Sequence, residues 1–264
     1  MFKHKKLIIL SVFTLAIAGS VVFISSQYAL PILMYHSVDK VVPKDNVLTV
    51  SVDTFEKQMA FFKKNHYQVL ALDSVADYVS KEKKVPSRAV VLTFDDGNED
   101  NYTYAFPILK KYDFPATIFV IVSEVGKPGR LSWGQIRQMR SSGLVSFGSH
   151  TLTHPFLPQI ESDQLLKNEI RGSKNELEKV LDTSVDTFCY PMGRFDPRVE
   201  AAVKDSGYKL AVATNPGYKF SSQDIFAVKR LRISENTRNM FIFWFETSGY
   251  YNFIREIRQH RKER

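Results

Sequence analysis

The run Ala89-Val-Val-Leu-Thr-Phe94 is apolar except for one threonine, and Asp95-Asp96-Gly97 follows it directly. Such a continuous run is typical of a strand that is buried on both faces of a parallel sheet. On either side of it, short β-type runs alternate with helical patterns, from residues 30–38 to residues 228–233. This alternation predicts βαβ units and therefore an α/β fold.

About seven strands are expected, and their number and length fit an incomplete parallel (β/α)7-type barrel better than a complete eightfold one. Among the helices, Asp53-Thr-Phe-Glu56 has the pattern of a capping box, and Phe55, Met59 and Phe62 would share one helical face. Residues 162–181 are expected to form one long helix. No internal repeat, low-complexity tract or interdomain linker divides the series.

The composition is that of a globular protein. With 264 residues, 44% hydrophobic and 24% charged, the chain is too apolar to be disordered and long enough for a sizeable core. Its one cysteine, Cys189, excludes an intramolecular disulfide and a thiolate metal cage.

The net charge of +8 is concentrated at the two ends of the chain. Residues 1–6 hold three lysines and no acid, and residues 255–264 hold five Lys and Arg against two Glu. The body between them is nearly neutral, so the net charge says little about a basic binding face. Because the basic residues are split between the two ends and no binding motif is present, we do not expect a nucleic acid as a partner.

Residues 7–24 form an uncharged, mostly apolar segment of 18 residues, which is about the length that a helix needs to span a bilayer. The lysines before it predict a cytoplasmic N-terminus, with everything after Ile24 outside the cell. A cleaved signal peptide, and hence secretion, is the alternative. We favour an uncleaved signal-anchor, because the candidate cleavage site after Ala29 has Gln27 where a small residue is expected.

We therefore expect three parts in the chain. Residues 1–29 would be a basic cytoplasmic tail, a transmembrane signal-anchor and a linker. Residues 30–240 would be one exported domain, and residues 241–264 a basic C-terminal tail. Export makes extracellular or cell-wall polymers the expected partners, with the membrane bound through the N-terminal helix, and we expect a monomer.

Two segments with metal-binding side chains follow predicted strands. Asp95 and Asp96 are adjacent carboxylates, which repel one another unless a cation or hydrogen bonds stabilise them. His150 and His154 can meet on one metal ion if the backbone between them makes a helical turn. Each segment also has an ordinary explanation, a turn for Asp-Asp-Gly and chance for the histidine spacing. Because parallel strands end at the same edge of a sheet, the two segments together favour a metal site such as zinc.

Two further strand ends carry residues of interest. Of the six histidines, only His36, His150 and His154 lie at predicted strand ends. Tyr190-Pro191-Met192-Gly193 follows a later strand. Taken alone, a single histidine is most often structural, and a Pro-x-Gly segment is most often a turn.

These segments together resemble the NodB-homology polysaccharide deacetylases, carbohydrate esterase family 4. Residues 93–97 and 150–154 are similar to the first two motifs of that family, and residues 190–193 are similar to a variant of the third. Residues 33–38, Leu-Met-Tyr-His-Ser-Val, resemble the subgroup that deacetylates poly-N-acetylglucosamine of biofilms. The likeness runs from about residue 31 to residue 233.

The resemblance implies a role for each matching residue. Asp96, His150 and His154 would hold a divalent metal, most often Zn²⁺, with Co²⁺, Ni²⁺ or Mn²⁺ as alternatives. Asp95 would be the general base that activates water. The backbone N–H of Met192 would stabilise the oxyanion.

The departures from the family pattern also have consequences. The late Leu-x-His segment that holds the general acid in most of the family is absent, so His36 is our candidate by analogy with the subgroup. Cys189 stands where the family has an arginine that supports the base, and Arg230 is our candidate to replace that arginine. Met192 stands where the third motif has a tyrosine.

We therefore expect a membrane-anchored, metal-dependent enzyme that hydrolyses the N-acetyl group of N-acetylglucosamine residues in an exported or cell-wall polysaccharide and releases acetate. The deacetylase domain would be residues 30–240. Deacetylation of peptidoglycan or of O-acetylated glycans is the alternative within the same fold. A non-catalytic glycan-binding protein is the alternative from a different class, and the presence of Asp95 and the complete ligand set argues against it.

Overall fold

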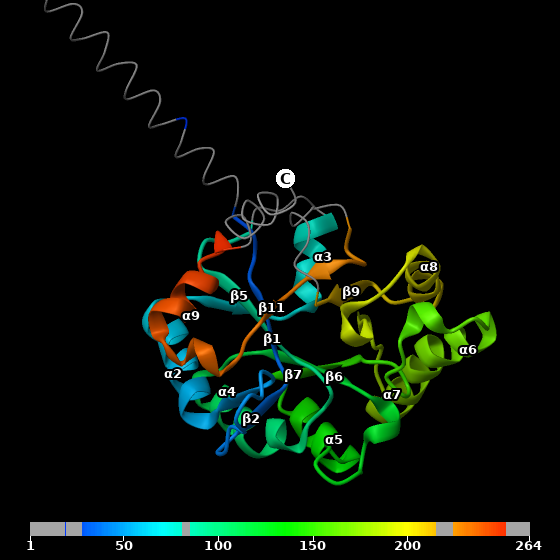
Figure 1. The fold of residues 1–264 in the computed structure, drawn as a ribbon, viewed down its shortest axis with the longest axis horizontal. Helices are drawn as coiled ribbons and strands as arrows, with labels where there is room; N and C mark the ends of the chain where they lie inside the picture. The colour runs from blue at the N-terminus through cyan, green and yellow to red at the C-terminus, as the bar shows by residue number, and fades with distance from the viewer. Residues whose placement is uncertain (1–18, 20–27, 81–84, 215–223, 252–264) are drawn as a thin grey trace, which may run out of the picture.

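The computed structural model describes residues 19, 28–80, 85–214 and 224–251. Its centre is a parallel sheet that curves until it nearly closes into a barrel, with helices on the outside (Figure 1). The strands of this sheet are β1 (Ile32–Tyr35), β4 (Gln68–Leu70), β5 (Ala89–Phe94), β6 (Ala116–Val120), β7 (Val145–Ser149), β8 (Thr187–Cys189), β9 (Leu210–Ala213), β10 (Val228–Lys229) and β11 (Leu231–Arg232). A small second sheet pairs β2 (Ser37–Asp39) with β3 (Thr49–Ser51) in parallel.

The helices lie round the perimeter of the barrel in Figure 1. The α-helices are α2 (Val52–Lys64), α3 (Asp73–Ser80), α4 (Phe106–Tyr112), α5 (Trp133–Ser141), α6 (Asp163–Lys167), α7 (Ser173–Leu181), α8 (Pro197–Asp205) and α9 (Met240–Glu246). The π-helical turns η1 (Asn101–Ala105) and η4 (Asn168–Gly172) precede α4 and α7. The 3₁₀ turns are η2 (Val122–Glu124), η3 (Leu157–Gln159), η5 (Pro191–Gly193) and η6 (Glu235–Arg238).

One split strand joins the two edges of the main sheet. The strand order is β10-β9-β8-β7-β6-β5-β1-β11, and β10 and β11 are consecutive in the chain with only Arg230 between them. β10 pairs with β9, and β11 pairs with β1. Counted as one, β10 and β11 reduce the eight strands of this order to seven positions, in agreement with the predicted parallel barrel.

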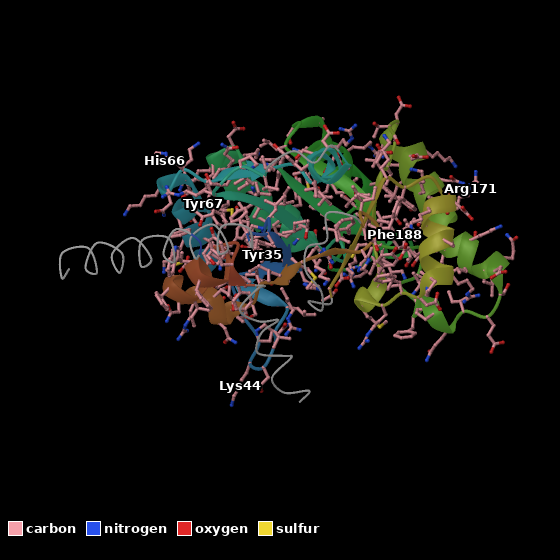
Figure 2. All side chains as sticks on the ribbon, turned by 90° about the horizontal axis from the view of Figure 1, so that it is seen from above. Tyr35, Lys44, His66, Tyr67, Arg171 and Phe188 are labelled. Atoms are coloured by element: carbon pink, nitrogen blue, oxygen red, sulfur yellow. The ribbon has the colours of Figure 1, made fainter. Side chains whose placement is uncertain are left out.

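Strand alternation divides the apolar side chains into an inner and an outer cluster. On β5, Ala89 and Val91 belong to the inner cluster, whereas Leu92 and Phe94 belong to the outer one, which also contains helix residues such as Phe55. Alternate residues of a strand face opposite sides, so the inner cluster fills the barrel and the outer cluster lies between sheet and helices. Figure 2 shows Tyr35 and Phe188 of the outer cluster within the body of the molecule, with Lys44 and Arg171 at its periphery.

Several predicted elements need correction. β5 begins and ends where the sequence predicts. The strand predicted over residues 30–38 is interrupted at His36, because β2 belongs to the second sheet. The helix predicted from Asp53 begins at Val52, and its N-cap is Ser51, which accepts the N–H of Thr54, so the capping-box assignment is wrong. The buried face with Phe55 is confirmed.

The long helix predicted over residues 162–181 consists of α6 and α7 joined by the π-helical turn η4. The proposed membrane anchor, residues 7–24, lies outside the described residues except for Gly19. Within the described part of the chain, no helix has the length and apolar character needed to cross a membrane. The anchor, the basic tail and the three-part division of the chain stay predictions.

Candidate active site

Strand alternation brings polar side chains together at one end of the barrel. The inward positions of β5 continue to Asp95, those of β7 continue to His150, and those of β8 end at Cys189. Arg230 occupies the inward position between β10 and β11. All four side chains are buried, at the end of the sheet where parallel α/β folds place their active sites.

Asp95 and Arg230 form a bidentate ion pair inside the barrel. Nη1 and Nη2 of Arg230 donate to Oδ1 and Oδ2 of Asp95 at 2.6 and 2.7 Å, and Nη1 also donates to Oγ1 of Thr93 at 3.1 Å. Burial by itself would raise the pKa of Asp95, but the guanidinium holds that pKa well below its usual range. The carboxylate is therefore ionised and fixed in orientation.

The guanidinium of Arg230 lies against an aromatic ring that the sequence analysis missed. Cζ of Arg230 is 5.4 Å from the ring centroid of Phe119 on β6. The ring occupies space beside Gly148 of β7, where a Cβ atom would lie only 2.5 Å from Phe119 and from Oγ1 of Thr187. Gly148 therefore admits the ring that supports the guanidinium, since a glycine in a strand allows such a close approach.

His150 has a defined tautomer and is neutral. Its Nδ1 lies 2.8 Å from the backbone carbonyl oxygen of Cys189. A carbonyl oxygen only accepts hydrogen bonds, so Nδ1 carries the proton and Nε2 has a free lone pair. Burial lowers the pKa of His150 to about 4, although Asp95 and Asp96 act in the opposite direction. The imidazole can therefore bind a metal through Nε2 at neutral pH.

Asp96, His150 and His154 have the spacing of a metal site. Nε2 of His150 lies 3.2 Å from Nε2 of His154 and 3.6 Å from Oδ1 of Asp96. The three ligand atoms lie within 4.8 Å of one another. A tetrahedral ion with bonds of about 2.0–2.2 Å requires ligand atoms about 3.3–3.6 Å apart. This set of one carboxylate and two imidazoles fits a divalent cation such as zinc.

The segments that carry these residues have an unusual backbone. Among non-glycine residues, φ is positive at Asp96 (71°), Thr151 (68°), His154 (61°) and Met192 (56°). Such conformations are unfavourable for residues with a Cβ atom, and they are frequent at functional sites. Gly97 follows Asp96 with a φ of 65°, so Asp-Asp-Gly is also the turn that the sequence suggests.

The histidines come together without the helical turn that the sequence analysis gave as the condition for their meeting. Residues 150–154 form an irregular loop, in which Oγ1 of Thr151 accepts the N–H of His154 at 2.9 Å. The carboxylate of Glu169, in η4, accepts the N–H groups of Leu152 and Thr153 at 3.0 and 2.9 Å. Side-chain acceptors thus replace the helical hydrogen bonds, and Glu169 lies too far along the chain for the motif to reveal it.

His36 follows β1 at the same end of the barrel. Together with Arg230 and His150 it lowers the pKa of Asp95, and its Nδ1 is buried with no hydrogen-bond partner in the described residues. Its carbonyl oxygen accepts from Nδ2 of Asn101 at 2.8 Å.

The next residue, Ser37, donates from Oγ to the carboxylate of Asp100 at 2.5 Å. Asp100 and Asn101 therefore hold the backbone that carries His36. Neither Asp100 nor Asn101 could be singled out from the sequence, because nothing in their own segment indicates contact with residues more than sixty positions away.

Met192 lies in the tight turn η5, where its side chain is 54% exposed. The following Gly193 has a φ of 66°, and a Cβ atom there would lie 2.5 Å from the backbone nitrogen of Thr214. The turn therefore packs directly against the end of β9. The proposed role of the Met192 N–H in oxyanion binding stays a prediction, as do the roles of Asp95, His36 and Arg230.

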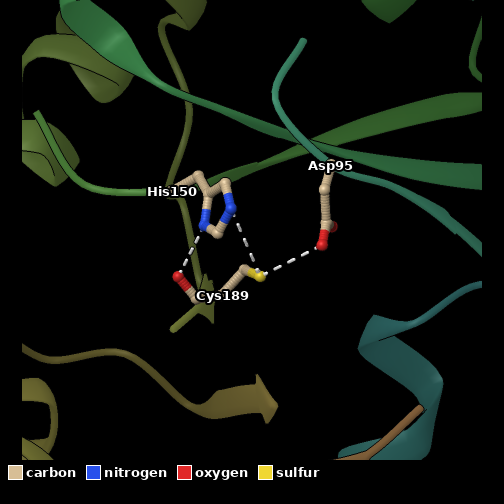
Figure 3. Close-up of side chains that lie close together, drawn as sticks. All are labelled: Asp95, His150 and Cys189. Atoms are coloured by element: carbon tan, nitrogen blue, oxygen red, sulfur yellow. Dashed lines mark hydrogen bonds between the residues drawn. The ribbon is translucent and has the colours of Figure 1, made fainter. Parts of the chain in front are cut away.

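A second group of metal-capable side chains consists of Asp95, His150 and Cys189 (Figure 3). Sγ of Cys189 lies 3.7 Å from Oδ2 of Asp95 and 3.9 Å from Nε2 of His150. Burial raises the pKa of the thiol well above its usual value, and Nη2 of Arg230 lies 3.0 Å from the sulfur. A protonated thiol beside a guanidinium disfavours a metal ion here.

Comparisons with known proteins find similar sequences and similar structures. The sequence model of the family described as polysaccharide deacetylase matches residues 82–211. YxkH of Bacillus subtilis (strain 168) is 35% identical over 205 residues, which cover 78% of this chain and 71% of that protein. The poly-beta-1,6-N-acetyl-D-glucosamine N-deacetylase of Staphylococcus aureus (strain MRSA252) is 28% identical over 200 residues, which cover 71% of this chain and 69% of that enzyme. The structure of Streptococcus pyogenes deacetylase PplD in complex with acetate matches with a TM-score of 0.74 and 32% identity, over 81% of this chain and 96% of that one.

Proposed function

Because the chain belongs to the polysaccharide deacetylase family, we propose that it hydrolyses the N-acetyl group of N-acetylglucosamine residues in an exported or cell-wall polysaccharide and releases acetate. The observation that carries this proposal is the contrast between two adjacent carboxylates. Asp95 is ion-paired with Arg230 inside the barrel, whereas Asp96 faces His150. This contrast supports proton transfer by Asp95 and metal binding by Asp96.

Asp96, His150 and His154 are the residues that would hold the metal, for which zinc fits the donor set. When bound, a divalent cation polarises the acetyl carbonyl and acidifies a water molecule. The hydrogen bond from Nδ1 of His150 to the carbonyl of Cys189 keeps Nε2 directed toward the other two ligand atoms.

Asp95 accepts the proton of the attacking water in this proposal. Each of its oxygens accepts one hydrogen bond from Arg230, and Oδ2 also accepts one from the Cys189 thiol at 3.7 Å, so Oδ1 keeps a second lone pair for a water proton. The bidentate pair also fixes the carboxylate plane, so little reorganisation is needed at the moment of attack.

His36 donates a proton to the departing sugar amine. An imidazole is the side chain suited to this transfer near neutral pH. The hydrogen bond from Asn101 to the carbonyl oxygen of His36 fixes the backbone from which the ring projects. The backbone N–H of Met192 would stabilise the negative charge that develops on the acetyl oxygen.

We also propose that residues 7–24 anchor the enzyme in the membrane with the catalytic domain outside the cell. The uncharged segment and the lysines before it support this orientation. Secretion after cleavage is the alternative, and the two differ in whether the mature protein stays in the membrane fraction.

Acetate release tests the function. The purified full-length chain is incubated in parallel with poly-β-1,6-GlcNAc oligomers, chitooligosaccharides, purified peptidoglycan and an O-acetylated glycan. We expect acetate from an N-acetylated polymer, loss of activity with a chelator, and recovery on addition of zinc or cobalt. Release from the O-acetylated glycan alone would make the protein an esterase. Glycan binding without acetate release would support the non-catalytic alternative.

A further inference from the structure

A cavity of about 540 Å³ opens at the mouth of the barrel, beside the candidate active site. Met192 and Arg230 line it together with Arg194, Thr214 and Arg232. Arg194 follows η5, Thr214 follows β9, and Arg232 ends β11. The cavity therefore lies at the ends of the strands, where the candidate catalytic residues also lie.

Arg232 lies two residues after Arg230, at the end of β11. Val228 belongs to the inner cluster of the barrel, and Leu231 and Ile233 belong to the outer cluster. The alternation therefore continues through the break, and Arg230 and Arg232 face the same side. Arg230 is buried and ion-paired, whereas Arg232 is exposed nearer the mouth.

Arg194 and Arg232 are both exposed, and their guanidinium groups make no ion pair or hydrogen bond within residues 28–80, 85–214 and 224–251. Glu246 also lines the cavity and is engaged in an interaction of its own. A guanidinium offers five N–H donors in a planar fork that matches a carboxylate or a phosphate. Ser234 and Asn236 add neutral hydrogen-bonding groups to the same lining.

We propose that Arg194 and Arg232 form a subsite for an anionic substituent, a carboxylate or a phosphate, carried by the glycan next to the acetamide that is hydrolysed. This inference rests on the proposed deacetylase function and specifies its substrate class as an acidic glycan rather than a neutral one. The same charges repel the sugar ammonium group that deacetylation produces, which favours release of the product.

The test compares three GlcNAc-containing oligosaccharides of equal length on the metal-loaded full chain. One is neutral, one carries a carboxylate as a lactyl ether, and one carries a phosphate monoester. We expect KM for one of the acidic oligosaccharides to be about tenfold lower than for the neutral one. The acidic oligosaccharide with the lower KM identifies which anion the subsite accepts. High salt should reduce the preference, because both guanidinium groups are exposed.

Arg232→Gln and Arg194→Gln should each raise KM for the acidic oligosaccharide several-fold and leave kcat and the neutral KM unchanged. Arg137→Gln is the matched control, because Arg137 is an exposed arginine of α5 that does not line the cavity. Equal KM values for the neutral and acidic oligosaccharides in the wild type, or unchanged KM values in both variants, would overturn the subsite.

Failure of the deacetylase function has a different signature, namely no acetate from any of the three oligosaccharides. Calorimetric binding of the same oligosaccharides then decides the subsite separately. Tighter binding of an acidic oligosaccharide by the wild type than by Arg232→Gln supports the subsite, and equal binding overturns it.

Discussion

Two groups of metal-capable side chains share His150 at the mouth of the barrel, and they differ in charge and exposure. The inner group adds Asp95 and Cys189, both buried, whereas the outer group adds Asp96 and His154, both partly exposed. Both groups have ligand atoms within 4.8 Å of one another, so distance does not separate them. The inner group already contains the guanidinium of Arg230, which neutralises its carboxylate. Charge balance therefore decides which group suits a metal.

The backbone at Asp96 creates this difference. Asp95 continues the inward alternation of β5, and the positive φ of Asp96 then turns the chain away. Two chemically identical neighbours consequently face different partners, Arg230 for the first and His150 for the second. An extended residue at position 96 would direct its carboxylate away from the barrel.

Removing His154 should give the largest effect, because it takes one ligand from the outer group alone. Loss of a residue that only hydrogen-bonds to a metal ligand lowers metal affinity by up to roughly 100-fold. His154 would be a ligand itself, so we expect His154→Ala to lower metal affinity by more than this and to abolish acetate release. Metal content after dialysis and acetate release measure the two effects.

Cys189→Ser is the matched variant of the inner group. It keeps the backbone carbonyl that accepts from Nδ1 of His150, so metal content should match the wild type. If Cys189→Ser lost the metal and His154→Ala kept it, the inner group would be the metal site and the charge argument would fail.

Arg230→Gln should produce the next largest effect, since it removes the cation from the inner group. A buried Asp95 without its partner is expected to destabilise the fold by about 3–5 kcal/mol. Arg230 lowers the pKa of Asp95, so its removal raises that pKa, and the acid limb of kcat/KM should move to higher pH by about one to three units. Denaturant unfolding and a pH–rate profile measure these changes.

Arg232→Gln is the control for Arg230→Gln, because it removes an exposed guanidinium from the same segment. The acid limb on a neutral oligosaccharide should stay where it is in the wild type. An unmoved acid limb in Arg230→Gln would show that the ionisation of Asp95 does not limit the rate, and its assignment as general base would then lose support.

Local sequence pattern was sufficient for much of the fold. The apolar run of β5 and the alternation of strands and helices predicted the parallel sheet, because both signals arise within one element. The closure of the barrel through the split at Arg230 was not predictable. It depends on which strands lie next to β10 and β11, and this is a property of the folded chain.

In the candidate site, too, the features that arise within one segment were predictable and those that depend on distant segments were not. The motifs drew attention to Asp95, Asp96, His150 and His154 because ligand residue types follow strand ends. The groups that orient them come from distant segments, such as the carboxylate of Glu169 behind the histidine loop. Such contacts leave no pattern in a single sequence, so the loop that brings the two histidines together could not be predicted.

A comparison of Asp100 with Asp95 separates the effect of burial on the pKa of a carboxyl group from the effect of a neighbouring cation. Its partners are the hydroxyl of Ser37, the N–H of Val38 and the amide of Asn101. Burial raises the pKa of Asp100 to about 6 even though these donors lower it. Asp95 is also buried, but its guanidinium partner moves its pKa in the opposite direction.

The pKa of Asp100 predicts the smallest effect, a pH-dependent stability. An aspartate in the unfolded chain has a pKa of about 3.9, so between about pH 4 and 6 the folded protein binds more protons at this position. The stabilisation is complete below the unfolded pKa and is lost as the pH rises through about 6.

Asp100→Asn cannot ionise and keeps an acceptor for the Val38 N–H, while its amide can donate to Ser37. Relative to the wild type, its free energy of unfolding should therefore rise by on the order of 2 kcal/mol from pH 4 to pH 7, measured by urea denaturation. The exposed Asp205→Asn is the control, and parallel curves for Asp100→Asn and the wild type would refute the burial argument.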